Sequence, residues 1–128
     1  MGVPDEDVGA IAGAGVVHVL PRAASGLTAT GSQLWGQGSG AIVDSAETDD
    51  RFGSALATGK LDSGAFAELI VGAPDESAGA TVGVGVLHVI PGSAGGLTGT
   101  GSQLWGQDSG GIADSAEAGD GFGAALGA

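Results

Sequence analysis

The protein has 128 residues, of which 28 are glycine, none is cysteine, and only three are basic against 15 that are acidic. Its net charge of −12 argues strongly against binding to nucleic acid, because contact with a phosphate backbone requires Lys and Arg that displace counterions. Without cysteine the chain has neither disulfide bonds nor thiolate metal sites. No apolar segment approaches the roughly 20 residues of a membrane-spanning helix, so we expect no membrane insertion.

Short apolar runs between glycine-rich turns predict β-strands throughout the chain. Helices are not expected, because glycine interrupts every window long enough for three helical turns. The clearest pattern lies in 83–90, where alternating residues end at Pro91. In chain order, the strands predicted for the central part cover residues 52–59, 66–72, 83–90 and 102–106, and a last one covers 122–126.

The chain repeats itself without a gap after 70 residues. His18 recurs as His88 (88 − 18 = 70), and the SQLWGQ segment at Ser32–Gln37 recurs at Ser102–Gln107 (102 − 32 = 70). About three in five of the aligned positions are identical. Repeat units of this kind bury their apolar faces against their neighbours, so we expect the two units to pack on one another.

Four antiparallel strands per period predict β-propeller blades, each a four-stranded meander. A glycine-rich β-roll is the rival all-β fold, but its period would be roughly 9 or 18 residues. We expect an incomplete propeller of about two blades: residues 1–50 are a partial blade with the end of a second strand and the third and fourth strands, 51–110 are a complete blade, and 111–128 are an inter-blade loop and the first strand of a further blade. Further blades would come from a longer chain, which we favour, or from other copies of this one.

These motifs resemble the FG-GAP repeat, which builds the propeller head of integrin α chains and occurs in secreted or surface proteins of bacteria. The resemblance rests on Asp50–Gly53, on Leu69–Pro74, on the second Phe-Gly pair at Phe122 and on Pro4–Glu6. It implies an extracellular or cell-surface location, although the N-terminal residues lack the basic start and apolar run of a signal peptide.

The family's calcium loop typically reads D-x-D-x-D-G-x-x-D between the first two strands, and this chain departs from it. The corresponding positions hold Lys60, Asp62, Gly64, Ala65 and Glu68, so only Asp62 and Glu68 remain as carboxylate ligands. Calcium requires six to eight oxygen ligands. We therefore expect no tight calcium binding and no other cofactor, and we expect the Lys60 ammonium to pair with Asp62 or Glu68 in place of the ion.

Most of the remaining acidic residues fall in connections that a meander places on one face. In an up-and-down blade, the second-to-third and blade-to-blade connections share a face, so we expect an acidic surface that engages a partner. The alternative is that this charge only keeps a glycine-rich β protein soluble. The carboxylates assigned to this surface are Asp44, Glu47, Asp49, Asp50, Asp75, Glu76, Asp114 and Glu117.

The function predicted from these patterns is a non-catalytic extracellular propeller module that recognises a protein or glycan. The alternative is an accessory propeller of a secreted hydrolase or lyase whose catalytic domain lies outside these residues. Ser25, Ser45 and Ser115 have no plausible His and Asp around them, so a hydrolase triad is not expected. His18 and His88 occupy equivalent strand positions and are expected to be packing residues between blades.

Overall fold

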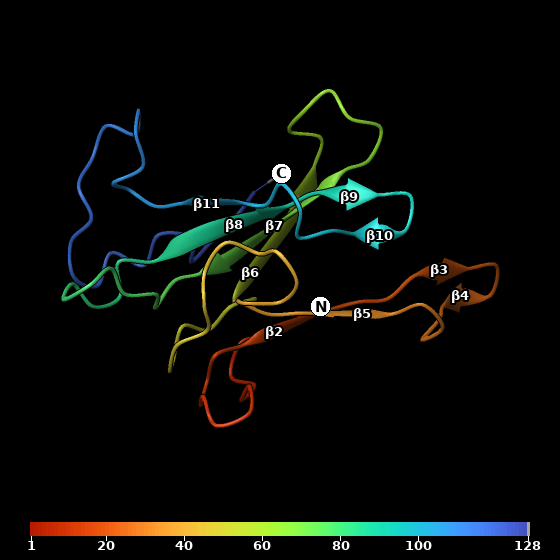
Figure 1. Ribbon diagram of the computed structural model, residues 1–128, viewed down its shortest axis with the longest axis horizontal. Helices are drawn as coiled ribbons and strands as arrows, with labels where there is room; N and C mark the ends of the chain where they lie inside the picture. Colours follow the sequence, from red (N-terminus) through yellow and green to blue (C-terminus); the bar gives the residue numbers. More distant parts are fainter. Residues whose placement is uncertain (128) are drawn as a thin grey trace.

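The protein is built from short antiparallel β-sheets, as a computed structural model that describes residues 1–127 shows (Figure 1). The first sheet has the strand order β1-β2-β5, with β1 (Gly2–Val3), β2 (Val16–Val19) and β5 (Gln33–Trp35). The second sheet has the order β11-β8-β7-β6, with β6 (Ala55–Gly59), β7 (Glu68–Ala73), β8 (Val86–Ile90) and β11 (Gln103–Trp105). The described range contains no helix and no closed barrel. The prediction of an all-β, incomplete propeller-like fold is confirmed.

The second sheet is a four-stranded meander whose register decides which side chains face the first sheet. Val71 pairs with His88, and Leu69 pairs with Ile90. Because successive side chains of a strand point to opposite faces, these four lie on one face of the sheet and Ile70 lies on the other. The β-branched and aliphatic run of β7 suits this position, since it is covered along most of its length.

The first sheet repeats this register 70 residues earlier. Val17 pairs with Trp35 as Leu87 pairs with Trp105. The first sheet has three strands, because β1 lies at its edge and no strand occupies the place that β6 takes beside β7. The sequence repeat is therefore a repeat of strand pairing.

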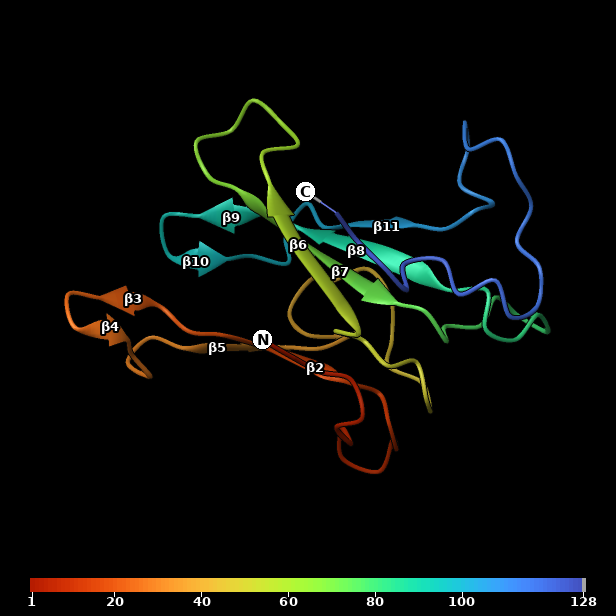
Figure 2. The same ribbon diagram turned by 180° about the vertical axis from the view of Figure 1, so that it is seen from behind.

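Two small hairpins extend from the sheets between the third and fourth strands. They are formed by β3 (Arg22–Ala23) with β4 (Gly26–Leu27), and by β9 (Gly92–Ser93) with β10 (Gly96–Leu97). The sequence did not predict them, because two-residue strands are too short to show an alternating pattern. Both hairpins project from the same end of the sheets, and the β7–β8 connection and the connection after β11 lie at the opposite end (Figures 1 and 2).

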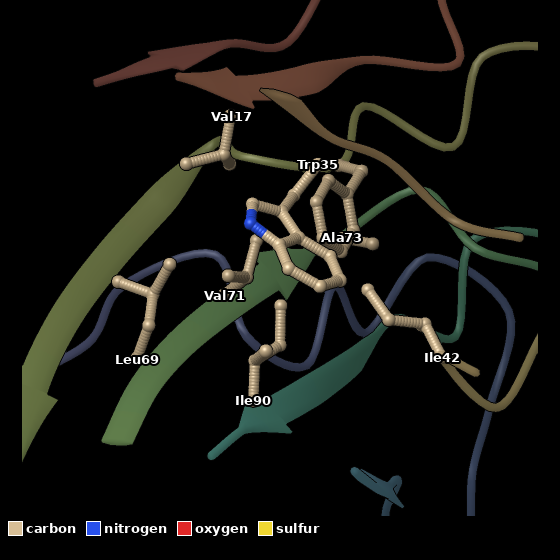
Figure 3. Close-up of a cluster of buried hydrophobic side chains, with 8 residues drawn as sticks. Val17, Trp35, Ile42, Leu69, Val71, Ala73 and Ile90 are labelled. Carbon is tan, nitrogen blue, oxygen red and sulfur yellow. The ribbon is translucent and has the colours of Figure 1, made fainter. Parts of the chain in front are cut away.

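The hydrophobic core lies between the two sheets rather than within either one. Val17 and Trp35 of the first sheet face Leu69, Val71 and Ile90 of the second (Figure 3). Val71 and Ile90 are completely buried, and Trp35 is 8% exposed. Each sheet therefore depends on its neighbour to bury its apolar face, as expected for blades of a repeat protein.

The Phe-Gly motif at Phe52 forms a turn that joins the two sheets. Gly53 donates its N–H to the Gly72 carbonyl of β7 at 3.0 Å, and a Cβ on Gly2 of β1 would overlap the Gly53 carbonyl. The backbones approach too closely for side chains, which explains glycine at Gly2 and Gly53. The predicted first strand consequently begins at Ala55 instead of residue 52.

The strand predicted at 122–126 is wrong for the residues that the structure describes. Phe122 and Gly123 repeat the turn, since a Cβ on Gly72 would overlap the Gly123 carbonyl just as one on Gly2 would overlap that of Gly53. No strand follows the turn as far as residue 127, and residue 128 lies outside the described range. The physical reason is that β6 is held by pairing with β7, and the corresponding neighbour for residues after Gly123 is absent from the described chain.

Hydrogen bonds between the sheets fix their relative position. Gln33 on β5 donates to the Leu97 carbonyl at 3.1 Å and accepts the Leu97 N–H at 2.9 Å. Ser102 accepts the Val43 N–H at 3.1 Å and donates to the Ala41 carbonyl at 3.2 Å. These pairs connect the first sheet and its outgoing loop to the second sheet near β10 and β11.

Candidate functional site

A cluster of carboxylates lies where the connection between the sheets meets the β7–β8 loop. The connection runs back along residues 12–14: Asp49 donates its N–H to the Ala12 carbonyl at 2.9 Å, and Phe52 donates to that of Ala14 at 3.0 Å. This pairing confirms that the second-to-third and blade-to-blade connections lie on one side. We call the set Asp44, Glu47, Asp50 and Glu76 the junction cluster.

The junction cluster brings three carboxylates close together in a largely buried setting. Ligand oxygens of Glu47, Asp50 and Glu76 all lie within 4.8 Å of one another. Asp50 and Glu76 are only 2% and 5% exposed, whereas Glu47 is exposed. Gln37 stands beside them and donates from Nε2 to Glu76 at 2.5 Å and to Asp44 at 3.3 Å. A neutral donor therefore shares two of the acidic groups.

Burial makes Glu76 a weak acid. It raises the pKa of Glu76 to about 8, and the negative charges of Asp44 and Asp50 raise it further, against a smaller opposing effect of the Gln37 hydrogen bond. The pKa of Asp50 is also raised, mainly by burial. Glu76 is consequently protonated at neutral pH, which reduces the repulsion among the four carboxyl groups.

His88 closes the cluster on the side of the second sheet. Its ring is completely buried and meets Phe52 edge to face, with centroids 5.2 Å apart. Burial lowers the pKa of His88 to about 4, although Asp44, 3.7 Å from Nε2, acts in the opposite direction. The ring nitrogens have no hydrogen-bond partner within residues 1–127. His88 is therefore a neutral packing group between the sheets, and its counterpart His18 is exposed.

The junction cluster has too few oxygen ligands for a tight calcium site. The carboxylates of Glu47, Asp50 and Glu76 could touch one cation, but calcium takes six to eight oxygens. A cation would also have to displace the proton that Glu76 holds at neutral pH. What the arrangement does chemically is hold a shared proton and a donated amide at the joint between two sheets.

Arginine 51 is the cation that the structure places at this end of the sheets. It binds Asp5 of the first unit at 2.8 Å and Asp75 of the second at 3.4 Å. Its backbone has a φ of 57°, a left-handed conformation that is unfavourable for a residue with a side chain. Gly121 takes the equivalent position with a φ of 60°. The arginine is thus kept where glycine fits more easily, and its ion pairs across the junction are the compensation.

The hairpin loop between β6 and β7 uses its two carboxylates to bind its own backbone. Asp62 accepts the Gly64 N–H at 2.6 Å, and the buried Glu68 accepts the Leu61 N–H at 2.6 Å. Lys60 donates to the Gly64 carbonyl. The expected ion pair of Lys60 with Asp62 or Glu68 is absent within residues 1–127, because both carboxylates already accept backbone N–H groups.

The eight carboxylates predicted for a partner surface have different environments. Asp44, Glu47, Asp50 and Glu76 come together in the junction cluster, and Asp75 lies at its edge with Arg51. Asp50 and Glu76 are buried inside the joint and cannot contribute to an exposed surface, because the opposing sheet covers them. Those that remain exposed away from the cluster are Asp49, Asp114 and Glu117.

The second unit carries an open counterpart of the junction cluster. Glu117 donates its N–H to Asp120 at 2.8 Å, as Glu47 does to Asp50 at 2.6 Å. Gln107 donates to Asp114 at 3.4 Å, repeating the contact of Gln37 with Asp44. These groups are local to the connection after β11, so they form without a following sheet.

Sequence reasoning missed Gln37 and the role of His88 in the cluster. The recurrence of both after 70 residues was visible, and a polar residue that repeats beside apolar strand positions was the available signal. What the sequence lacked was the opposing sheet, which brings Glu76 to Gln37 across 39 positions of the chain.

No family model, curated protein or solved structure matches this chain. Its site must therefore be interpreted from its own residues. Within residues 1–127 there is also no helix of the length and apolar character needed to cross a membrane.

Proposed function

We propose that the chain is a non-catalytic β-propeller module of the FG-GAP type that recognises a protein ligand through its acidic end, outside the cell or at its surface. The observation that carries the proposal is the collection of exposed carboxylates at one end of both sheets. The exposed groups at that end include Asp7, Asp49, Asp114, Glu117 and Asp120. A surface of one charge sign attracts ligands of the other sign.

The chemistry of this end favours a ligand rich in Lys or Arg. Arg51 already binds Asp5 and Asp75, so it neutralises only part of the acidic surface. The other two basic residues, Arg22 and Lys60, lie in the β3–β4 hairpin and in the β6–β7 loop. Attraction of this kind accelerates association and weakens as salt is added.

The side chains support binding rather than catalysis. The chain has two histidines, and neither is placed as a general base. His88 is buried with both ring nitrogens unpaired within residues 1–127, and its low pKa comes from that burial. A nucleophile requires a base within hydrogen-bond distance, and no hydroxyl group is hydrogen-bonded to a histidine in the described chain.

The test is binding of the purified chain to an immobilised lysine-rich peptide at increasing salt, with a glutamate-rich peptide as reference. The variant Asp114→Asn, Glu117→Gln, Asp120→Asn removes three carboxylates from the exposed end without touching the junction. We expect at least a tenfold loss of affinity at low salt, because each charge at the contact contributes on the order of a few-fold.

A charge-matched control separates the acidic end from net charge. The variant Ala24→Lys, Ser25→Lys, Ala94→Lys changes the net charge by the same three units at the exposed hairpin tips, which lie at the opposite end. It should keep most of the affinity of the unmodified chain. Equal losses in both variants would show that only total charge matters and would contradict a binding surface at the acidic end.

A further inference from the structure

The two sheets meet through one interface, and each sheet carries the other half of that interface on its outer side. At the internal junction, the Val17 and Trp35 face of the first sheet covers the Val71 and Ile90 face of the second. By register, the second sheet repeats the first of these faces on its outer side, where Trp105 stands. The first sheet repeats the other face on its own outer side, where Met1 lies at the position of Val71.

The outer side of the second sheet is an open groove. Its lining includes Ile70, Leu87, Trp105, Ile112 and Phe122. Trp105 is 37% exposed where its counterpart Trp35 is 8% exposed. Likewise, Ile112 is 36% exposed where Ile42 is 6% exposed. The difference is not in the residues, which are identical, but in whether a sheet covers them.

The outer side of the first sheet is exposed in the same way. Met1 is 63% exposed where Val71 is completely buried, and Leu27 is 70% exposed at the position of the partly buried Leu97. His18 is exposed where His88 is completely buried. The two outer faces are thus complementary halves of a contact that the chain already makes once.

The polar groups at these faces are also arranged for a second contact. At the internal junction Gln33 binds both backbone groups of Leu97. Its counterpart Gln103 instead accepts the Trp105 indole N–H at 2.9 Å, whereas the buried indole nitrogen of Trp35 has no partner within residues 1–127. Gln103 is therefore held by a local substitute for the contact across the sheets.

We propose that the outer face of the second sheet binds the outer face of the first sheet of a second copy of this chain, head to tail. The occupant is a second copy because the internal junction shows that these two surfaces fit. In the new junction, Gln103 binds the backbone of Leu27 of the second copy, and Trp105 is covered. The carboxylates Asp114 and Asp120 are joined by Glu6 of that copy, which completes a second acidic cluster.

Because the two faces differ, the contact is heterologous: each copy offers one face of each kind and can bind a copy on either side. One feature makes it weaker than the internal junction. Gly121 stands in place of Arg51, so the ion pairs that Arg51 makes with Asp5 and Asp75 have no counterpart. The net charge of −12 also opposes association, which salt should relieve.

The first test is the molar mass of the full chain by sedimentation velocity over a range of concentrations at moderate salt. We expect the mass to rise from one chain towards two and above. Trp105→Lys should reduce association at least tenfold, whereas Val82→Lys, at a residue that is 68% exposed in the β7–β8 loop, should leave it unchanged. Gly121→Arg should lower the midpoint concentration about two- to fivefold, as expected for exposed ion pairs.

Cysteine cross-linking tests the geometry independently, since the chain has no cysteine of its own. Val43 and Ser102 touch across the internal junction, and the head-to-tail contact brings Ala113 of one copy to Ser32 of the next. Ala113→Cys with Ser32→Cys should give disulfide-linked oligomers, and Val43→Cys with Ser102→Cys should give a linked monomer as positive control. Either cysteine of the first pair alone should remain unlinked.

A chain that stays monomeric at every concentration would overturn the proposal. Association that is unaffected by Trp105→Lys would do so too, as would cross-linking through Ser32→Cys alone, which would indicate a symmetric contact. Since none of these measurements uses a basic ligand, their failure would leave the proposed recognition function untouched.

Discussion

Replacing Glu76 with glutamine is expected to remove the loss of stability that the unmodified protein shows at alkaline pH. Burial raises the pKa of Glu76 to about 8 in the folded chain, from an ordinary value of 4.5. Between these values the folded chain holds a proton that the unfolded chain has released. The free energy of unfolding therefore falls as the pH rises through this range, and the contribution of Glu76 is fully present only below its unfolded pKa.

The range above pH 6.5 isolates this effect from the other titrating groups. Burial lowers the pKa of His88 from 6.5 to about 4, so between those values the unfolded chain binds the extra proton and stability rises with pH. Asp50, whose pKa burial raises from 3.8, acts in the same direction as Glu76 at more acidic pH. Above the ordinary pKa of histidine only Glu76 contributes, and at 1.36 kcal/mol per pH unit the loss between about pH 6.5 and 9 is about 2 kcal/mol.

Urea unfolding followed by tryptophan fluorescence, at a series of pH values with a metal chelator present, measures this loss. The Glu76→Gln variant keeps an uncharged group beside Gln37 and should show a nearly constant free energy of unfolding above pH 6.5. Glu6→Gln changes the equivalent but exposed residue and should retain the loss. A constant free energy in the unmodified protein, or an unchanged slope in Glu76→Gln, would refute the assignment of a buried protonated carboxyl group.

Two further predictions concern the core and the hairpin loop. Trp35→Ala should cost about 3–5 kcal/mol of unfolding free energy, because it empties the core between the sheets, whereas Trp105→Ala should cost less than about 1 kcal/mol in dilute monomer; equal losses in urea unfolding would contradict a core placed between the sheets. Calorimetric titration should detect no micromolar calcium binding to the unmodified chain, whereas Lys60→Asp with Gly64→Asp should introduce it by restoring two carboxylate ligands of the hairpin loop; tight binding by the unmodified chain would show that the loop needs fewer carboxylates than we infer.

Local pattern was sufficient for the strands and their order. The aliphatic run of β7 and the alternation of β8 predicted strands that the structure has, with ends shifted by one to three residues. The Phe-Gly turn was predicted as part of β6, because sequence does not show that its backbone is held against Gly2 and Gly72. The two-residue hairpins had no pattern to reveal them.

The candidate site was only partly predictable, for a different reason. The acidic connections and their common side followed from strand order in a meander. The buried state of Asp50 and Glu76, and the part played by Gln37, depend on a sheet that lies far away in the sequence. The predicted calcium loop could be assessed from residue types alone, but its hydrogen bonds could not.

The sequence by itself determined the 70-residue repeat, the all-β class, the turns at glycine and proline, and the acidic ends of the loops. These are properties of residues and their near neighbours, and they are the same in both units. Only the tertiary structure decided which copy of each residue is buried. Trp35 and Trp105 lie in identical SQLWGQ segments, yet one is core and the other is surface. The reason is that burial requires an opposing face, and only one face of each sheet has one.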